Sequence, residues 1–133
     1  MRYMLLIYTQ EAAPRTPEEF QAGMAGHRAL MEETRNRGIL LGADPLKPTS
    51  TATTVRVRDG KPLITDGPFA ETKEQLAGYY MLECKDLDEA INYASKIPLF
   101  CAGGNVGGVE VRPVMEFAEI QKQFESMLSE QHA

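Results

Sequence analysis

The spacing of apolar positions divides the chain into short strands and three helices. Apolar side chains fill both faces of residues 2–8, which is typical of a central strand covered on both sides. Alternating apolar and polar residues predict a strand over 53–58, and Asp59-Gly60 predicts a hairpin turn before a returning strand over 61–65. Further strands are predicted at 39–41, 78–84 and 109–113.

Three segments have the apolar spacing of amphipathic helices. The first begins at Thr16, which can form a capping box with Glu19, and it ends before Gly38. The second begins after Asp86 and stops at Pro98. The third carries an apolar stripe that consists of Phe117, Ile120, Phe124 and Leu128.

The order of these elements predicts the architecture. Two β-α-β halves with a hairpin between them, and with both helices on one side of the sheet, indicate an α+β fold with a ferredoxin-like subunit and an appended C-terminal helix. The other face of the sheet would expose Met4, Leu6 and Tyr8, and a contiguous apolar surface normally marks an interface. We therefore expect a homodimer. The rival expectation is a monomer in which the third helix folds back over this face.

Length, composition and charge indicate the size of the domain, the kinds of partner it can bind and its location in the cell. The chain has 133 residues, of which 43% are hydrophobic and 25% charged, so it is long enough for one globular domain with its own core. Its net charge is −5 and its basic residues form no stripe, so we expect no nucleic-acid partner. No apolar run has the length of a membrane span or of a signal peptide, which predicts a cytoplasmic protein.

The sequence predicts neither a metal site nor a cofactor site. Cys84 and Cys101 lack the paired spacing of zinc and redox motifs, and buried free thiols are the simpler interpretation. The glycine-rich run 103–108 lacks the strand-loop-helix context of a phosphate-binding loop. A reaction would then rest on acid–base side chains.

His27 is the side chain best suited to proton transfer. It lies in the apolar stripe of the first helix, and a histidine there must be hydrogen-bonded or must open onto a cavity. Imidazole titrates near neutral pH and often serves as a general acid or base. The competing interpretation is a structural histidine with satisfied hydrogen bonds at the edge of the core. The predicted stripe consists of Phe20, Met24, His27 and Met31.

Residues 65–74 contain the second candidate site. Asp66 begins an Asp-Gly-Pro turn signal, and an aspartate that caps local backbone N–H groups would explain it without any function. The same segment also brings Lys73 and Glu74 close to Asp66 along the chain. A carboxylate beside an imidazole would orient its tautomer and raise its basicity.

The last predicted strand carries polar side chains on one face. Glu110 and Arg112 lie opposite Val109 and Val111, so they would line the uncovered face of the sheet if the valines pack on the helices. An ion pair between subunits is the structural interpretation. Ligand binding by Arg112 is the functional one.

Several of these runs resemble one known family. The run DGPFAETKEQLAGYYMLE at residues 66–83 resembles the signature of the DGPF subgroup of the YCII-related family. The opening MRYMLLIY, the stretch from His27 to Gly42 and the run VEVRPV at 109–114 agree with it. The resemblance covers residues 1–117, interpreted as one domain, and leaves 118–133 as a C-terminal helix and tail. It implies a ferredoxin-like subunit that pairs into a dimeric α/β barrel.

The resemblance implies an acid–base enzyme. Short family members carry a first-helix histidine that is suspected as the catalyst, and His27 matches it. Their partnering aspartate precedes a proline before the last strand, where this chain has Ile97-Pro98. Asp66 could replace that aspartate only if the DGPF turn folds back toward the first helix. The reaction would be of the isomerase or lyase type on a small organic substrate, with ligand-binding residues Lys73, Glu74 and Arg112.

The same resemblance also implies a function of a different class. Members of the DGPF subgroup resemble proteins found beside extracytoplasmic-function sigma factors. The chain would then be a non-catalytic dimer that binds a small ligand or takes part in transcription control. The Ile97 position favours this alternative, because it lacks one half of the suspected catalytic pair.

Overall fold

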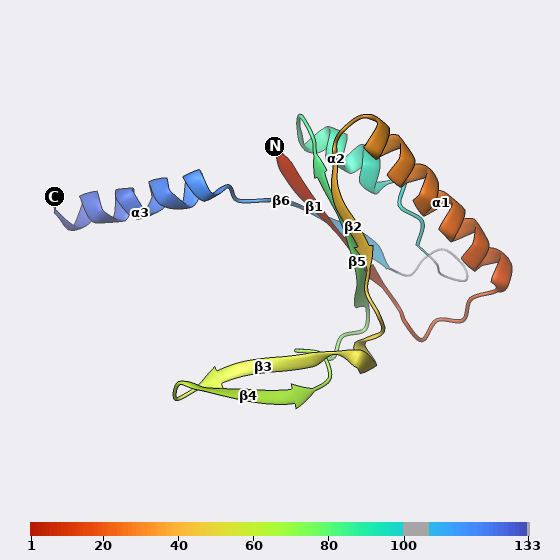
Figure 1. Ribbon diagram of the computed structural model, residues 1–133, viewed down its shortest axis with the longest axis horizontal. Helices are drawn as coiled ribbons and strands as arrows, with labels where there is room; N and C mark the ends of the chain where they lie inside the picture. Colours follow the sequence, from red (N-terminus) through yellow and green to blue (C-terminus); the bar gives the residue numbers. More distant parts are fainter. Residues whose placement is uncertain (100–106, 133) are drawn as a thin grey trace.

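The computed structural model describes residues 1–99 and 107–132 and shows a mixed α+β fold. A four-stranded antiparallel sheet carries two helices on one face (Figure 1). A separate two-stranded hairpin and a C-terminal helix project from the other side of the sheet (Figure 1). The predicted order of β-α-β, hairpin, β-α-β and appended helix is confirmed for the described residues.

The sheet has the strand order β2-β5-β1-β6. Its strands are β1 (Arg2–Thr9), β2 (Leu40–Pro45), β5 (Gln75–Glu83) and β6 (Gly108–Pro113). The hairpin consists of β3 (Thr53–Arg58) and β4 (Lys61–Asp66), and a 3₁₀ turn (Thr49–Thr51) precedes it. The helices are α1 (Pro17–Asn36), α2 (Leu87–Ala94) and α3 (Phe117–Gln131).

Two strands are longer than the sequence predicts, because their backbones pair with each other. Strand β2 continues to Pro45, which lies opposite Gly78 of β5. Only glycine fits there, since a Cβ atom at Gly78 would lie 2.8 Å from the carbonyl oxygen of Asp44. Helix α2 is shorter than predicted and ends at Ala94. Its last turn tightens, because Ile97 N–H donates to the Ala94 carbonyl before Pro98.

Helix α1 begins and ends as predicted. Thr16 Oγ1 accepts a hydrogen bond of 3.1 Å from the backbone N–H of Glu19 and also donates to the Glu19 carboxylate. Gly38, just beyond the helix, has a φ of +72°, a conformation that favours glycine.

The face of α1 that packs on the sheet differs from the predicted stripe. Phe20 is 52% exposed and Met24 is 44% exposed, so this part of the stripe was wrong. The buried positions of the helix are instead Gly23, Leu30 and Thr34. Small residues can face the sheet because they let the helix approach closely. The hydroxyl of Thr34 is satisfied by its own helix, where it donates to the Leu30 carbonyl at 2.8 Å.

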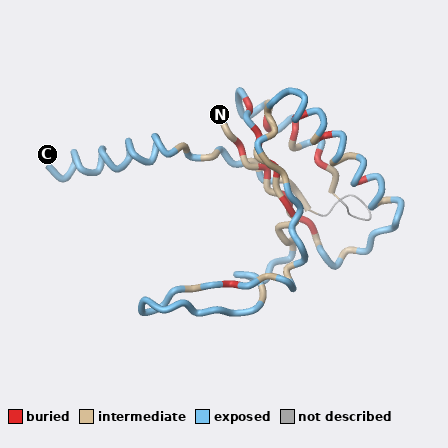
Figure 2. The backbone as a smooth tube through the Cα atoms, viewed as in Figure 1, coloured by how far each residue is buried: buried red, intermediate tan, exposed pale blue. Residues whose placement is uncertain are grey.

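The core lies between the sheet and the two helices, where Figure 2 shows the buried segments. Burial alternates along β1, so this strand is covered on one face within the subunit, and not on both faces as predicted. The helix-facing side of the sheet includes Leu5, Leu82 and the free thiol of Cys84, all almost fully buried. The cluster is completed by Tyr3, Ile7, Leu30, Tyr80, Ala90, Tyr93 and Ile97.

The C-terminal helix does not cover the open face of the sheet. None of its residues is buried, and Phe117 and Phe124 are 78% and 59% exposed. Its root is held at the sheet edge, because Arg2 Nε and Nη2 each donate a 2.9 Å hydrogen bond to the Glu116 carboxylate. The subunit therefore leaves one sheet face open, as Figure 1 shows.

Two sequence predictions fall outside the described residues. They are the state of Cys101 and the conformation of residues 103–106 of the glycine-rich run. Across the parts of the chain that the structure describes, no helix has both the length and the apolar character needed to cross a membrane.

Candidate functional site

The central feature of the candidate site is a contact between α1 and the middle of the sheet. His27 Nδ1 lies 2.7 Å from the hydroxyl oxygen of Tyr80. The two rings are stacked, with their centroids 5.9 Å apart and their planes inclined by 14°. Tyr80 lies on the helix-facing side of β5 and is 3% exposed, whereas His27 is half-buried. The buried tyrosine therefore fixes the orientation of the imidazole.

Burial controls the charge of both groups. It lowers the pKa of His27, because the charged imidazolium loses hydration, so the neutral ring is favoured near neutral pH. Burial also raises the pKa of Tyr80 to about 12, so the phenol keeps its proton. Both rings of the pair are therefore uncharged near neutral pH.

The tautomer of His27 decides what the ring can do. With its proton on Nδ1, the ring donates to the Tyr80 oxygen, and Nε2 keeps a lone pair that can accept a proton. With its proton on Nε2, the phenol donates to Nδ1 and Nε2–H becomes a donor. Both forms use the same 2.7 Å contact, and in the Nδ1–H form Tyr80 accepts that hydrogen bond both before Nε2 gains a proton and after Nε2 gives the proton up.

The chain between α2 and β6 passes beside this pair. A Cβ atom at Gly26, the neighbour of His27, would lie 3.1 Å from Pro98 Cγ, so the Ile97-Pro98 segment packs against α1 at this level. Ile97 itself is 6% exposed and belongs to the core. The position where the family resemblance expects an aspartate therefore lies in a segment that packs against α1, and it holds an apolar side chain.

The structure does not bring Asp66 to His27 within one subunit. Asp66 is the last residue of β4, is exposed, and pairs with Thr53 in the hairpin. The hairpin and α1 lie on opposite sides of the sheet (Figure 1). Lys73 is also exposed and lies in the segment that leads from the hairpin to β5.

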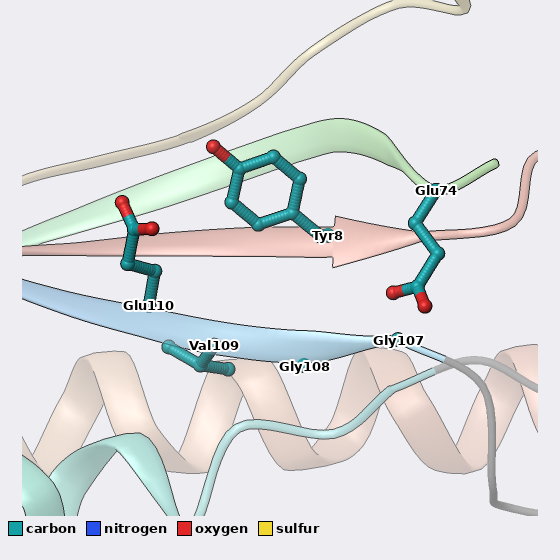
Figure 3. Close-up of a pocket in the computed structure, with 6 residues that line it drawn as sticks. All are labelled: Tyr8, Glu74, Gly107, Gly108, Val109 and Glu110. Carbon is teal, nitrogen blue, oxygen red and sulfur yellow. The ribbon is translucent and has the colours of Figure 1, made fainter. Parts of the chain in front are cut away.

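A separate cavity of about 370 Å³ opens at one end of the sheet. Glu74 belongs to its lining, together with Tyr8 and Glu110. Figure 3 shows the side chains of Tyr8 and Glu110 on one side of the strands and Val109 pointing the other way, toward the helices. The predicted separation of Glu110 from the valine face is confirmed. The full set of described lining residues is Tyr8, Glu74, Gly107, Gly108, Val109 and Glu110.

The described lining of this cavity includes one of the three predicted ligand-binding residues, Glu74. Two carboxylates and one phenol face it, and neither Lys73 nor Arg112 belongs to its described lining. Arg112 lies on the same open face, 70% exposed, with its Nε 3.9 Å from a Glu110 carboxylate oxygen. The electrostatic character of the described lining therefore suits a cationic or hydrogen-bond-donating group.

A second cavity, of about 380 Å³, lies on the helix side of the sheet. Its lining is apolar except for Ser95 and consists of Ile91, Ala94, Ser95, Ile97, Leu99, Val109 and Val111. Among residues 1–99 and 107–132, no group of three or more His, Cys, Asp or Glu side chains is arranged to hold a metal ion.

Sequence reasoning identified His27 but missed Tyr80. The signal was present in β5, where Gly78, Tyr80, Leu82 and Cys84 alternate and share the face turned toward the helices. A tyrosine on a buried face needs a partner for its hydroxyl, and His27 is a polar residue of α1 on the facing side.

Comparison with known proteins identifies one family model that matches most of the chain. Residues 1–118 match the family model described as the YCII-related domain. An uncharacterized protein, R00369, from Rhizobium meliloti (strain 1021) is 38% identical over 116 residues, covering 86% of this chain and 92% of that protein. A solved structure, the 5-chloro-2-hydroxyhydroquinone dehydrochlorinase TftG from Burkholderia phenoliruptrix AC1100 in complex with 2,5-dihydroxybenzoquinone, has a TM-score of 0.44 and 14% identity. That alignment covers 89% of this chain and 97% of TftG.

Proposed function

This chain belongs to the YCII-related family, and we propose that it is an acid–base enzyme of the isomerase or lyase type that acts on a small organic substrate. The observation that carries the proposal is the 2.7 Å contact between half-buried His27 and buried Tyr80. A neutral, oriented imidazole is the arrangement that proton transfer near neutral pH requires.

His27 is the proposed catalytic residue and Tyr80 the positioning residue. With Nδ1–H donating to Tyr80, Nε2 takes a proton from a carbon beside a carbonyl group of the substrate. In an isomerisation, the same nitrogen returns that proton to a neighbouring atom. In an elimination, the electron pair of the broken C–H bond forms the new double bond and a leaving group departs with its own pair. Tyr80 keeps its proton throughout, because burial raises its pKa to about 12.

The other site residues predicted from the sequence are supported to different degrees by their positions in the structure. Glu74 is the best-supported ligand-binding residue, since it lines the cavity on the open face. Arg112 shares that face, and Lys73 precedes Glu74, so both are proposed as contacts for a ligand bound on the open face, on the side of the sheet away from His27. Asp66 would take part at His27 only through an approach between subunits. Tyr80 therefore replaces it as the proposed partner of His27.

The proposed assembly is a cytoplasmic homodimer of the DGPF subgroup, built from ferredoxin-like subunits that form a dimeric α/β barrel. The strand order β2-β5-β1-β6 supports the subunit fold. The open face supports the pairing, because Met4, Leu6 and Met81 lie there side by side, in register across β1 and β5. Stable interfaces of this kind bury roughly 1,600 Å².

Proton exchange tests the enzymatic proposal without knowledge of the full substrate. The purified chain is incubated in D₂O with a panel of small carbonyl compounds, and exchange of the hydrogens beside the carbonyl is followed by NMR. We expect the wild type to accelerate exchange for at least one compound and His27→Gln to abolish the acceleration. Tyr80→Phe should reduce it, since the ring loses its orienting partner.

His132→Gln is the matched control, because His132 is the second of two histidines and lies at the end of α3. It should exchange at the wild-type rate. Equal acceleration by wild type and His27→Gln would refute the role of His27. No acceleration by any variant over a broad panel would favour the alternative function below.

A non-catalytic ligand-binding or regulatory dimer is the second candidate, including a role in transcription control with a sigma factor. The observation that favours it is the position of the Glu74–Glu110 cavity on the sheet face turned away from α1. A ligand held there by the two carboxylates would not meet His27. Binding that survives His27→Gln but is lost in Glu74→Gln/Glu110→Gln would support it.

A further inference from the structure

Two arms leave the open side of the sheet from opposite ends of it (Figure 1). The helical arm is α3 (Phe117–Gln131), and the hairpin arm is the β3–β4 unit from Thr53 to Asp66. None of the helical arm is buried, and Thr54 is the buried residue of the hairpin arm. Figure 2 shows both arms as almost wholly exposed. An isolated two-stranded hairpin is at best marginally stable in water, so this arm needs a surface to pack against.

The hairpin arm has one apolar face and one basic face. Its register pairs Val55 with Ile64 and Val57 with Pro62, and paired residues of a hairpin share a face. Val57 is 70% exposed and Ile64 is 65% exposed. The opposite face carries Arg56, Arg58 and Lys61.

The helical arm also has an apolar side, and its other side is acidic where that of the hairpin arm is basic. Its apolar stripe is exposed along its whole length and consists of Phe117, Ile120, Phe124, Met127 and Leu128. The rest of its surface carries Glu119, Glu125 and Glu130 against the single cation Lys122. The two arms also agree in length, since 15 helical residues span about 22 Å and six-residue strands about 20 Å.

The two arms of one subunit do not meet. They run away from the sheet at its two ends, and the Arg2–Glu116 ion pair holds the root of the helical arm. A second subunit that packs on the open face by a two-fold axis can therefore pair the arms in two ways. One choice of axis brings like arms together, helix on helix and hairpin on hairpin. The perpendicular choice brings each helix onto the other subunit's hairpin.

We propose that two copies of the chain exchange their arms, so that each helical arm lies on the apolar face of the other subunit's hairpin arm. The inference rests on the homodimer proposed above and specifies its geometry. Pairing like arms would set three glutamates against three glutamates and the basic hairpin tips against each other. The exchange instead covers both apolar faces and places each acidic helix beside a basic hairpin, whose long arginine and lysine side chains start from the far face and can reach around the strand edges toward the glutamates.

Charge reversal in the full-length chain tests the exchange. The helical variant is Glu125→Lys/Glu130→Lys, and the hairpin variant is Arg58→Glu/Lys61→Glu. Arg56 is left unchanged because its guanidinium lies 4.8 Å from the centre of the Phe69 ring. The dimer dissociation constant of each is measured by sedimentation, with circular dichroism to verify folding. Each reversal alone should weaken the dimer at least about tenfold, and the quadruple variant should regain most of the lost affinity.

A matched control reverses two exposed glutamates of α1, Glu18→Lys/Glu32→Lys, and should leave the dissociation constant unchanged. The wild-type dimer should weaken with added NaCl, because the arms attract each other. A dimer that no reversal affects, or one that salt strengthens, would overturn the arm exchange and leave the dimer itself standing. A wild-type species of 14.8 kDa at every concentration would overturn both.

Discussion

His27 and Tyr80 join the middle of α1 to the middle of the sheet through a contact of 2.7 Å between Nδ1 and the phenol oxygen. This contact holds a titratable ring at the edge of an apolar core. Its charge state is therefore coupled to the stability of the fold and to any chemistry at the ring.

Histidine NMR gives a direct measurement of this coupling. The chain has two histidines, so a ¹H–¹⁵N spectrum of the imidazoles contains one signal set from His27 and one from His132. We expect His27 to titrate below the ordinary value of 6.5 because its charged form loses hydration. Assignment follows from His27→Gln. A His27 pKa above 6.5 would contradict the neutral imidazole on which the proposed mechanism rests.

The same shift predicts how stability depends on pH. In the window from 6.5 down to the lowered pKa of His27, the unfolded chain binds a proton that the folded chain does not. Stability should therefore fall as the pH falls through this window. The wild type should lose more stability than His27→Gln between pH 7 and pH 5, as measured by urea denaturation. Equal losses would show that His27 titrates alike in both states.

Tyr80 should affect the stability of the fold at alkaline pH. Its pKa of about 12 exceeds the ordinary value of 10, so above pH 10 the unfolded chain releases a proton that the folded chain keeps. Stability should fall with rising pH by an amount on the order of 2 kcal/mol by pH 12, and Tyr80→Phe should remove this component. A wild-type profile identical to that of Tyr80→Phe would contradict the buried, protonated phenol.

Two substitutions compare the stability contributed by the helix-capping residue Thr16 with that contributed by the exposed carboxylate of Asp66. Thr16→Ala should cost about 1 kcal/mol of unfolding free energy, since Thr16 accepts from the Glu19 N–H at the start of α1. Asp66→Asn should change it by less than about 0.5 kcal/mol, because Asp66 is exposed and its side chain caps no backbone N–H of the described residues. Chemical denaturation of both variants checks the pair. A large loss in Asp66→Asn would restore the structural interpretation of the Asp-Gly-Pro turn.

The Arg2–Glu116 ion pair should matter more for assembly than for folding. Both side chains are more than a third exposed, so Glu116→Gln should cost less than about 1 kcal/mol of subunit stability. It should nevertheless weaken the dimer, because the root of α3 loses its bidentate anchor. Sedimentation combined with thermal denaturation measures both effects. A dimer constant equal to that of wild type would show that this pair does not set the direction of α3.

The sequence predicted most helices and strands, because the residues that begin and end these elements act on the neighbouring backbone. Thr16 with Glu19, Asp59-Gly60 and Gly38 act within a few residues of chain, and all three mark the boundaries that the structure shows. The buried face of α1 depends instead on what packs against it. Gly26 lies against Pro98, far along the chain, and the helix buries Gly23, Leu30 and Thr34 in place of the predicted stripe.

The candidate site was predictable in part for the same reason. His27 stood out as the polar residue of an apolar helix face. Its partner Tyr80 comes from a strand more than 50 positions later, and only the pairing of β5 with β1 and β2 fixes which of its faces meets α1. Asp66 looked suitable by residue type, but the hairpin carries it to the other side of the sheet.

The attachment of the hairpin has an evolutionary consequence. The chain leaves the sheet after Leu46 and re-enters it at Gln75, and a hydrogen bond of 2.7 Å from the Leu46 N–H to the Ala77 carbonyl holds the two ends close together. The excursion therefore starts and finishes at neighbouring points, so a short connection could join β2 to β5 without moving either strand. The hairpin is thus a removable module. Relatives could gain or lose it by a single insertion or deletion, and with it the proposed exchange of arms, while keeping the same four-stranded sheet and helices.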